Sequence, residues 1–527
     1  MSALYSVAEI RQVESTALAA LPPYTLMQRA GAACAEQALQ LIQSCEQTRQ
    51  RLPVLILAGP GNNGGDALEA AQLLAQASVP TWVMLHADRN KQPEDARTAL
   101  QRAESSGVTF IAGDSLAHLP EQRWGLVMDG LFGIGLTRPP SAKVRALIEH
   151  INGLRCPILA IDVPSGLNAD SGSIVGGADG VAVRATHTLT FIGDKTGLHT
   201  CDGKDHSGTV LLRTLDTDAA GIKPAQAFLN GTAQFASALR PRASNSHKGS
   251  YGDVIVVGGA RGMAGAPVLA ARTAAYGGAG RVYVAFVDDG PAYDSAHPEL
   301  MFRVADRVEF ASSAALVVGP GMGTSRHAHD ILARALESES NLVLDADALN
   351  LIAAEPALQH KLHHRSPPHG SGAPQSAIIS IITPHPLEAA RLLDLTTQQI
   401  QADRPHAARL LARHFNTIAV LKGAGTVIAF PDGEIVINPN GNPGLSTAGT
   451  GDILSGLCGA LLAQGWSTRH AALAAPWLHG AAADQLVEQG LGPVGLTASE
   501  FIPAIRAVFN KIIRDHVQRP AASPQQH

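Results

Sequence analysis

Short apolar segments alternate with longer amphipathic stretches along the first half of the chain, and glycine-rich turns join them. The short apolar runs predict β-strands, and the amphipathic stretches predict helices. We predict helices at 8–20 and 26–44, followed by strands at 54–58, 81–85, 126–129, 158–163 and 188–191.

The second half of the chain repeats this alternation after a break. Between residues 215 and 246 the pattern dissolves into polar and proline-containing segments, so we place a domain boundary near Pro224. Beyond it we predict helices at 266–276 and 386–393, strands at 253–257, 281–286, 315–318, 342–344, 377–382 and 418–422, and a hairpin of 426–430 with 435–437.

Repeated strand–turn–helix units are typical of α/β domains with mostly parallel sheets. We expect one domain at 1–222, a second at 230–512 and a disordered tail at 513–527. The segment 363–376 is rich in proline, glycine and histidine, which predicts a surface loop whose histidines are solvated rather than metal ligands.

Composition excludes several classes of protein. A chain of 527 residues is too long for one core, and its net charge of −5 gives no basic footprint for nucleic acid. The sequence has no long apolar run that could span a membrane and no secretion signal at its start. Five scattered cysteines without CxxC spacing favour neither disulfides nor a zinc site. We expect a cytoplasmic protein and a homo-oligomer, although the sequence does not give the number of subunits.

The segment 444–452, Gly-Leu-Ser-Thr-Ala-Gly-Thr-Gly-Asp, runs directly into an apolar helix and is the most informative motif. The small residues Ala448 to Gly451 leave backbone N–H groups bare at the helix start, which is an anion site. A carboxylate at Asp452 would repel a bound phosphate, so we interpret Asp452 as a base. It would remove the proton from a hydroxyl group that then attacks that phosphate. A plain acidic residue favoured by the helix dipole is the simpler alternative.

A second motif lies in the first half, where Gly59, Gly61 and Gly64 form G-x-G-x-x-G between a predicted strand and a helix. With Asp88 about 20 residues further on, this spacing is typical of dinucleotide-binding folds and of dehydrogenases. The polar pair Asn62-Asn63 and the final Asp66 argue against an ordinary dehydrogenase.

Carboxylates also follow two other predicted strands in this half, at Asp129 and in Asp162-Val-Pro-Ser-Gly-Leu. Ligands bind at the carboxyl ends of parallel strands, and two carboxylates there would repel a phosphate unless a cation lay between them. Oxygen ligands from Asn, Asp and Ser suit a hard cation rather than zinc. The loop 133–139 adds bare N–H groups and Arg138 for a phosphate.

Several glycine-rich strand exits in the second half predict a nucleotide site. Lys422, followed by Gly-Ala-Gly-Thr, stands at a strand end where it can reach a phosphate, and similar turns lie at 258–265 and 319–323. His385 is held between two prolines beyond another strand, and Asp345-Ala-Asp places two carboxylates beyond a third. Tight chain reversal explains any one of these turns, but not all of them together.

These motifs carry a resemblance to two known families. Residues 1 to about 220 resemble the NAD(P)H-hydrate epimerase family through Gly-Asn-Asn-Gly-Gly-Asp at 61–66, Asp129 with Gly-Ile-Gly-Leu at 133–136, and the Asp162 segment. Residues of about 230–510 resemble the ADP-dependent NAD(P)H-hydrate dehydratase family. The resemblance implies a Rossmann-like three-layer αβα sandwich followed by a ribokinase-like α/β domain, in the tandem order of bacterial bifunctional nicotinamide nucleotide repair proteins.

For the first domain, the resemblance implies a potassium ion held by Asn63, Asp129 and Ser165. It implies Asp162 as a catalytic residue, and it gives no firm role to Lys195. Residues implied to contact the hydrated dinucleotide are Asn62, Asn63, Gly64, Gly65, Asp66, Gly133, Ile134, Gly135, Leu136, Thr137, Arg138, Pro139 and Asp162.

For the second domain, the resemblance implies ADP as co-substrate and Mg²⁺ between its phosphates. ADP would phosphorylate the C6 hydroxyl of the S hydrate with Asp452 as base, and elimination would then release phosphate, AMP and NAD(P)H. Residues implied to contact the hydrate are Ala266, Gly323, His385 and Asp452, and those at the adenine nucleotide are Lys422, Gly423, Ala424, Gly425, Thr426 and Gly451.

Two other functions stay open at this point. The second domain could be a small-molecule kinase of the vitamin-kinase sort, which would use the same anion site and base but leave a phosphorylated product. The first domain could be a non-catalytic dimerisation or RNA-binding module. The sequence also leaves open ADP against ATP, the preference between NADHX and NADPHX, and direct transfer of substrate between the sites.

Overall fold

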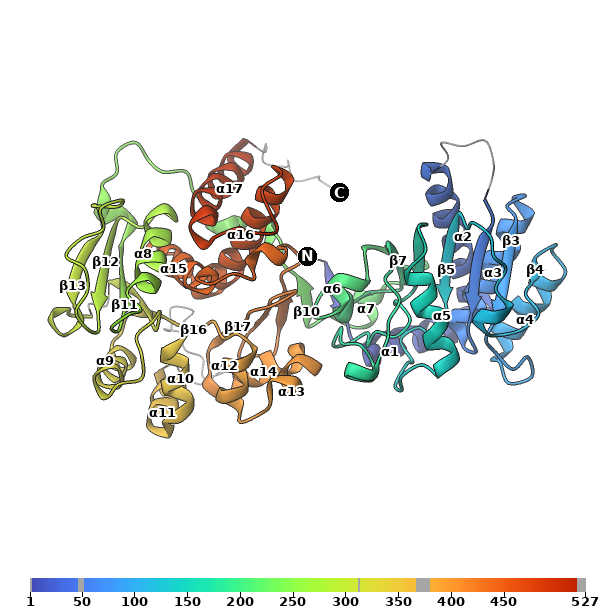
Figure 1. The fold of residues 1–527 in the computed structure, drawn as a ribbon, viewed down its shortest axis with the longest axis horizontal. Coiled ribbons are helices and arrows are strands. Elements are labelled where there is room, and N and C mark those ends of the chain that lie inside the picture. Colours follow the sequence, from blue (N-terminus) through green and yellow to red (C-terminus); the bar gives the residue numbers. More distant parts are fainter. Residues whose placement is uncertain (1, 46–51, 311–312, 366–379, 519–527) are drawn as a thin grey trace. The chain divides into compact units, whose positions relative to one another are not determined.

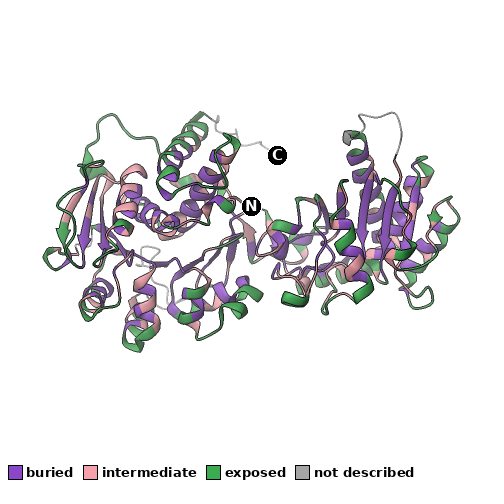
Figure 2. Cartoon of the chain, viewed as in Figure 1, coloured by how far each residue is buried: buried purple, intermediate pink, exposed green. Residues whose placement is uncertain are grey.

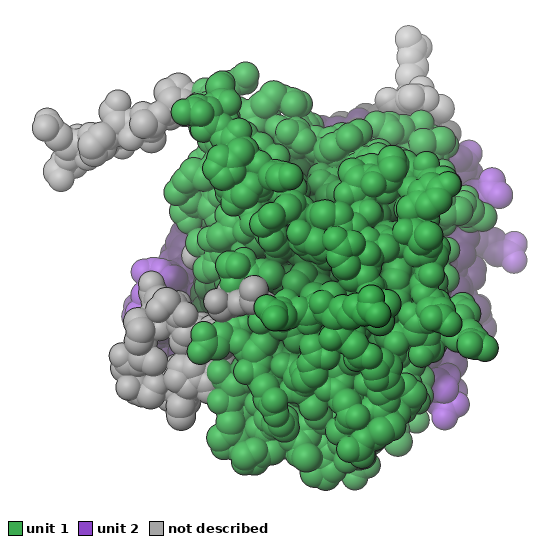
Figure 3. All heavy atoms as spheres, turned by 90° about the vertical axis from the view of Figure 1, so that its left-hand side faces the viewer, with its two compact units in different colours: residues 1, 228–527 green, residues 2–227 purple. Residues whose placement is uncertain are grey.

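The computed structural model describes residues 2–45, 52–310, 313–365 and 380–518. The chain divides into two compact units, residues 2–227 and residues 228–527, which Figure 3 shows in separate colours. Each unit is an α/β domain, as the sequence predicted. No helix among the described residues is long and apolar enough to cross a membrane.

The first unit is built on a parallel sheet that has seven strands among the described residues. The chain enters at the middle of this sheet, so the strand order reverses between two neighbours, β2 and β5. Ligands bind where the order reverses in such sheets. In spatial order the strands are β4 (Thr109–Phe110), β3 (Thr81–Leu85), β2 (Val54–Ala58), β5 (Leu126–Gly130), β6 (Ile158–Ile161), β7 (His187–Phe191) and β9 (Thr209–Arg213).

Alternating side chains of β2 show why this unit has three layers. Val54, Ile56 and Ala58 belong to one apolar cluster, whereas Leu55 and Leu57 belong to another on the opposite face. The first cluster packs under α1 (Val7–Ala20), α2 (Thr25–Cys45), α3 (Asn62–Gln76) and α4 (Glu94–Glu104), and the second under α5 (Ala142–Asn152). The predicted αβα sandwich is therefore confirmed (Figure 1). This unit also contains a short parallel pair of strands, β1 (Ala3–Tyr5) with β8 (Asp194–Lys195).

The second unit also has a mostly parallel sheet in which the order reverses, here between β11 and β14. The antiparallel hairpin predicted around Asp432-Gly433 is present at one side of the sheet as β18 with β19. In spatial order the strands are β13 (Met301–Val304), β12 (Arg281–Phe286), β11 (Asp253–Gly258), β14 (Ala314–Val318), β15 (Asn341–Leu344), β16 (Ile381–Ile382), β17 (Ile418–Leu421), β18 (Val427–Ala429) and β19 (Ile435–Ile437).

Helices cover both faces of this sheet, and its strands are buried between them (Figures 1 and 2). One group consists of α8 (Gly265–Tyr276), α15 (Thr450–Ala463), α16 (Thr468–Glu488) and α17 (Ala498–Gln518). The other consists of α9 (Arg326–Glu337), α10 (Asp347–Ala354), α11 (Pro356–Arg365), α12 (Pro386–Leu393), α13 (Thr397–Ala402) and α14 (Arg404–Phe415).

Helix α15 lies unusually close to its neighbours because of two glycines on its inner face. A Cβ added to Gly456 would lie 2.1 Å from the carbonyl oxygen of Ala270 in α8, and one added to Gly459 would lie 2.5 Å from a methyl carbon of Val317 in β14. Side chains at these two positions would push the helix away from the sheet and from α8.

Several element boundaries differ from the sequence prediction, and three of them bear on the argument. Helix α3 begins at Asn62, so the Asn-Asn-Gly-Gly segment that we expected in a turn forms the first turns of a helix. Helix α17 continues to Gln518, because Ile512 and Ile513 pack on the apolar cluster of the second unit; residues 513–518 are therefore helical rather than part of a tail. Helix α11 includes residues 363–365 of the predicted loop, whereas residues 366–376 of that loop, 377–379 of the predicted strand and 519–527 lie outside the described residues.

Candidate functional sites

In the first domain, the turn after β2 is shaped by close backbone packing. A Cβ on Gly59 would lie 1.8 Å from the carbonyl oxygen of Leu131, and one on Gly64 would lie 2.0 Å from that of Gly59. These two glycines of the G-x-G-x-x-G motif therefore let the turn, α3 and the loop after β5 meet at the switch point. Gly61 caps α3 without a side-chain hydrogen bond, which leaves the first N–H groups of the helix for a ligand.

Asp129 and Ser165 form a tight buried pair next to this turn. Ser165 donates from Oγ to Asp129 Oδ1 at 2.6 Å and from its backbone N–H to Oδ2 at 2.8 Å. Ser165 Oγ also accepts from the backbone N–H of Phe132 at 2.8 Å. Burial raises the pKa of Asp129 to about 6, although the hydrogen bonds from Ser165 act in the opposite direction.

Asn63 stands out because both polar atoms of its side chain are buried and have no hydrogen-bond partner in the structure. Its side chain lies over the loop after β5, since a Cβ on Gly133 would be 3.3 Å from both Asn63 Cγ and Asp162 Oδ2. A buried amide is costly unless its polar atoms have partners, so the Asn63 side chain is suited to contact a ligand.

Asp162 is paired with a lysine that the sequence had left without a firm role. Lys195 is almost completely buried, and its Nζ lies 2.5 Å from Asp162 Oδ1. The same ammonium donates to Thr190 Oγ1 and to the carbonyl oxygen of Phe191, each at 2.8 Å. Asp162 has a φ of 65°, in the left-handed region that residues other than glycine rarely adopt.

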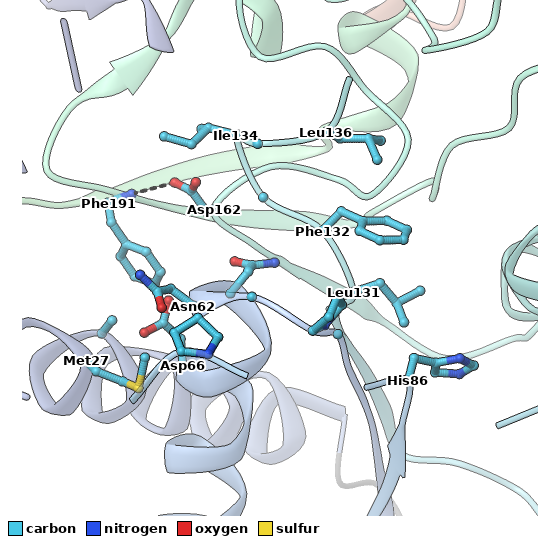
Figure 4. Close-up of a pocket in the computed structure, with 18 of the residues that line it drawn as sticks. Met27, Asn62, Asp66, His86, Leu131, Phe132, Ile134, Leu136, Asp162 and Phe191 are labelled. Carbon is cyan, nitrogen blue, oxygen red and sulfur yellow. Dashed lines mark hydrogen bonds between the residues drawn. The ribbon is translucent and has the colours of Figure 1, made fainter. Parts of the chain in front are cut away.

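These residues surround a cavity of about 980 Å³ at the switch point (Figure 4). Of the predicted substrate contacts, Asn62, Asn63, Asp66, the loop 133–139 and Asp162 line it. Gly64 and Gly65 do not; both are buried, and a Cβ on Gly65 would strike Met27, which lines the cavity. Asp129 and Ser165 lie behind the lining, around the loop 131–133.

Helix α1 contributes two further charged residues to this cavity, Arg11 and Glu14, which the sequence analysis did not identify. The pKa of Glu14 is raised by burial and by the nearby Asp162. The pKa of Asp66 is raised well above its usual value, again by burial first and then by Asp162 and Glu14. The cavity thus combines carboxyls that favour the protonated form with a carboxylate held by a lysine.

We predict that the ion pair between Lys195 and Asp162 stabilises the fold of the first domain. Lys195→Met should destabilise the first domain by about 3–5 kcal/mol, because it leaves the mostly buried Asp162 carboxylate without its counter-charge. Adding Asp162→Asn should restore most of that stability. Hydrogen exchange of peptides from β5 to β7 in the full chain measures the change, and equal losses in the single and double variants would show that Lys195 acts by packing alone.

In the second domain, the centre of the candidate site is Lys422 at the end of β17. Its Nζ donates to Asp345 Oδ1 at 2.7 Å and lies 3.9 Å from Glu388 Oε2. Burial disfavours the ammonium charge, but Asp345 and Glu388 outweigh it and raise the pKa of Lys422. A Cβ on Gly451 would lie 3.2 Å from Lys422 Nζ, so this lysine stands at the N-terminal end of α15.

Asp452 lies in the first turn of α15, as the sequence predicted, and the helix begins after Gly449 without a side-chain cap. Burial and the negative charge of Asp345 raise the pKa of Asp452 to about 7, against the opposing effect of Lys422. Burial likewise raises the pKa of Glu388 to about 7. The site therefore holds two carboxyls that titrate near neutral pH beside one fixed cation.

His385 is mounted at the N-terminus of α12. Its Nδ1 accepts from the backbone N–H groups of Leu387 and Glu388 at 3.1 and 3.4 Å, and its Nε2 lies 3.3 Å from Glu388 Oε1. Burial, and after it the nearby Lys422, lower the pKa of His385. The neutral ring is thus held in one orientation by the helix cap and by Glu388.

Of the remaining predicted residues, Ala266 lies in the first turn of α8, and the others lie on glycine-rich loops. Ala266 and Gly323 lie near Gly321, since a Cβ on Gly321 would be 3.3 Å from Ala266 Cβ, and the N–H of Gly323 donates to Asp347 Oδ2 at 2.9 Å. In the loop after Lys422, Gly423 lies against the buried Arg404 and Thr426 Oγ1 donates to the Gly423 carbonyl oxygen at 3.1 Å. Ala424, which is exposed, and Gly425, which is buried, complete this loop.

The sequence analysis missed Glu388 and the asparagine loop that supports the catalytic segment. In that loop, Asn442 Nδ2 donates to Asp484 Oδ1 and the N–H of Gly441 donates to Asp484 Oδ2, both at 2.9 Å. Asn438 donates to the carbonyl oxygen of Pro476 in α16 at 3.2 Å. The run of asparagines before the glycine turn was the available signal, because such side chains often hold loops in place.

Comparison with known proteins assigns a family to each half. Residues 23–197 match the family described as YjeF-related protein N-terminus, and residues 254–505 match the family described as NAD(P)H-hydrate dehydratase. The bifunctional NAD(P)H-hydrate repair enzyme Nnr of Coxiella burnetii is 35% identical over 523 residues, which cover 97% of this chain and 100% of that protein. The chain belongs to the bifunctional NAD(P)H-hydrate repair enzyme family.

A curated relative that matches the second half alone agrees with this assignment. The ADP-dependent (S)-NAD(P)H-hydrate dehydratase of Neisseria meningitidis is 42% identical over 292 residues, which cover 54% of this chain and 95% of that protein. Among solved structures, the ADP/ATP-dependent NAD(P)H-hydrate dehydratase of Bacillus subtilis is 28% identical and covers 54% of this chain and 98% of its own, with a TM-score of 0.45. The family match of the second half confirms the fold class predicted for it, ribokinase-like α/β.

Proposed function

We propose that the chain repairs hydrated nicotinamide dinucleotides in two steps, one in each domain. The first domain interconverts the R and S hydrates, and the second converts the S hydrate to NAD(P)H while ADP becomes AMP and phosphate. The observation that carries this proposal is the full-length match to a bifunctional repair enzyme, together with a separate cluster of buried charges in each domain. The same match favours the dehydratase over a vitamin-type kinase, and an enzyme over a non-catalytic first domain.

In the second domain, hydroxide is a poor leaving group, so the C6 hydroxyl is first turned into a phosphate ester. Asp452 removes the hydroxyl proton as the oxygen attacks the β-phosphorus of ADP and displaces AMP. N1 of the ring then supplies an electron pair as the C6–O bond breaks and phosphate leaves, and C5 loses a proton so that the C5–C6 double bond forms. Lys422 and the free N–H groups of α15 hold the phosphates, and the loop 423–426 holds the rest of the nucleotide. Ala266, Gly323 and His385 position the hydrate. Mg²⁺ bound between the phosphates would neutralise their charge.

In the first domain, inversion at C6 requires the carbon–oxygen bond to break on one face of the ring and to form again on the other. One group must give a proton to the departing hydroxyl, and another must take a proton from the incoming water. Figure 4 shows Asp66 and Asp162 lining the same space, one from α3 and one from the turn after β6. We assign the proton donor to Asp66, whose pKa is raised, and the acceptor to Asp162 beside Lys195.

The residues implied to hold potassium fit such an ion. The Oδ1 of Asn63 is buried without a partner, and the Asp129 and Ser165 oxygens lie next to the backbone of the loop 131–133. Oxygen donors with a single carboxylate suit a hard monovalent cation. The ion would supply positive charge for the dinucleotide phosphates, and it would fix the loop after β5 around them.

The proposal predicts that epimerisation can be removed without loss of dehydration. With mixed hydrates and ADP, the wild-type chain should convert all of the substrate to reduced dinucleotide, whereas Asp129→Ala should stop once the S fraction is consumed. Wild-type protein in a tetramethylammonium buffer free of potassium should slow at the same point. Absorbance of the reduced nicotinamide and release of free phosphate follow both reactions.

Asn63→Ala is the cleaner variant for this test, because it removes no hydrogen bond and should not destabilise the fold. It should behave as Asp129→Ala does. Complete conversion by both variants, faster than the spontaneous epimerisation measured without enzyme, would contradict the assignment of the first domain. A wild-type chain that leaves a phosphorylated metabolite instead of free phosphate would contradict the assignment of the second.

A further inference from the structure

A second large cavity, of about 1170 Å³, lies in the second domain and has no part in the proposed reactions. It is lined by Tyr251 before β11, by Gly280 before β12 and by Met301 at the start of β13, which are the amino ends of parallel strands. Lys422, Asp345 and the other candidate catalytic residues follow the carboxyl ends. The two sites are therefore at opposite ends of the same sheet. Residues of helix α17 and of the segment 240–251 also line this cavity.

The lining of this cavity is strongly basic. It includes Arg240, Arg242, Lys248, Arg506 and Arg514, whereas Glu299 is the one acidic residue that the described chain contributes. A further arginine there, Arg281, is neutralised by two hydrogen bonds to Asp253 at 2.7 and 2.6 Å. The whole chain has a net charge of −5, so this concentration of positive charge is not a general property of its surface.

Two of the arginines are held in place without losing their charge to a carboxylate. The guanidinium of Arg242 stacks 3.7 Å from the ring centre of Tyr251 and donates to the carbonyl oxygen of Gly278. That of Arg506 lies 4.5 Å from the ring centre of Tyr276. Within the described residues, Lys248 and Arg514 make no hydrogen bond or ion pair through their charged groups. The cavity thus presents preorganised and uncompensated cations.

We propose that this basic cavity is a binding site for a nucleoside polyphosphate, separate from the catalytic nucleotide site. Arginine forks and lysine are the side chains that bind phosphate oxygens, and several of them converge here. Leu300, Phe509 and Ile513 supply an apolar part of the wall for an aromatic base. The volume exceeds the 980 Å³ of the first-domain cavity, so a nucleotide fits by size.

Calorimetric titration of the full chain with ADP in the presence of Mg²⁺ tests this site. Lys248→Ala/Arg514→Ala should lose one ADP per chain relative to the wild type, because the two exposed side chains contribute charge and no packing. Lys422→Ala should lose the other ADP, which binds at the dehydratase site. The variant that carries all three changes should therefore lack both ADP molecules. The matched control is Arg307→Ala/Arg326→Ala, which removes two exposed charges of the same domain outside the cavity and should keep the wild-type number.

Titration with inorganic tripolyphosphate separates recognition of phosphate from recognition of a nucleotide. We expect tripolyphosphate to bind at least tenfold more weakly than ADP at the site that Lys248→Ala/Arg514→Ala removes. Equal binding of the two ligands would overturn the nucleotide assignment, and an unchanged ADP number in Lys248→Ala/Arg514→Ala would overturn the site itself. Loss of ADP binding in Lys422→Ala tests the proposed dehydratase site. It does not bear on the basic cavity, so the two proposals can fail separately.

Discussion

Asp452→Asn should reduce dehydration of the S hydrate by about 10²–10⁴-fold and leave epimerisation unchanged. Asparagine keeps the size of the side chain at the start of α15 but cannot accept the hydroxyl proton. The loss should appear in kcat rather than in KM for ADP, because Lys422 and the helix N–H groups still hold the phosphates. Rates of phosphate release and of change between R and S, measured on the same preparation, give both readouts.

The pH dependence of the same reaction provides a second readout. The pKa of Asp452 is raised to about 7, and the base must be deprotonated to act. For the wild type, kcat/KM should therefore be low at acidic pH, rise as the pH approaches about 7, and stay constant above it. Asp452→Asn should lose this rise.

A matched control is available in the same domain. Asp432 is exposed in the β18–β19 turn, where its Oδ1 accepts from the N–H of Glu434 at 2.9 Å, and asparagine can accept that bond equally well. Asp432→Asn should dehydrate at the wild-type rate. Dehydration by Asp452→Asn within a factor of a few of that rate would remove the assignment of Asp452 as base.

Asp162→Asn should produce the opposite separation, with epimerisation lowered by about 10²–10⁴-fold and dehydration of the S hydrate intact. Asparagine tolerates the left-handed backbone at this position, where φ is 65°. Because the change leaves the buried Lys195 ammonium without its counter-charge, hydrogen exchange of β5 to β7 must first show that the domain is still folded. The measurement is the interconversion rate of purified R and S hydrates without ADP.

The control for this variant is Asp205→Asn, an equally small change at an exposed residue of α6 (Gly203–His206) that does not line the cavity. It should epimerise like the wild type. If Asp162→Asn also kept the wild-type epimerisation rate, the proton acceptor would have to be another group of the cavity. Glu14 would be the first alternative, because it is a carboxyl that interacts electrostatically with Asp162.

The strands, and the functional residues that follow them, were predictable because parallel strands are short, continuously apolar and followed by distinctive turns. Asp129, Asp162 and Lys422, which we predicted at strand ends, lie at the carboxyl edges of the two sheets. Their partners were not predictable in the same way. Lys195 meets Asp162 through an ion pair between β8 and the turn after β6, and no local pattern marks which lysine will be buried.

The predicted helix boundaries were wrong where tertiary packing outweighed the helix propensity of the residues. Two asparagines and two glycines are poor helix formers, so the sequence of 62–65 predicts a turn. The helix α3 nevertheless begins at Asn62, and the space beside Gly64 and Gly65 admits no side chain. Glu14 and Glu388 belong to ordinary amphipathic helices in the sequence. Only the folded arrangement shows that each faces a charged site.

The two glycines on the inner face of α15 limit how this chain could be made more heat-resistant. Replacing glycine by alanine inside a helix is a common stabilising choice, worth about 1 kcal/mol when the site has room. Here the new methyl group at Gly456 would meet the backbone of α8, and the helix that carries Asp452 would have to move to accept it. A search for thermostable variants should therefore leave Gly456 and Gly459 unchanged, since gains in helix propensity there would be lost in the alignment of the base with its substrate.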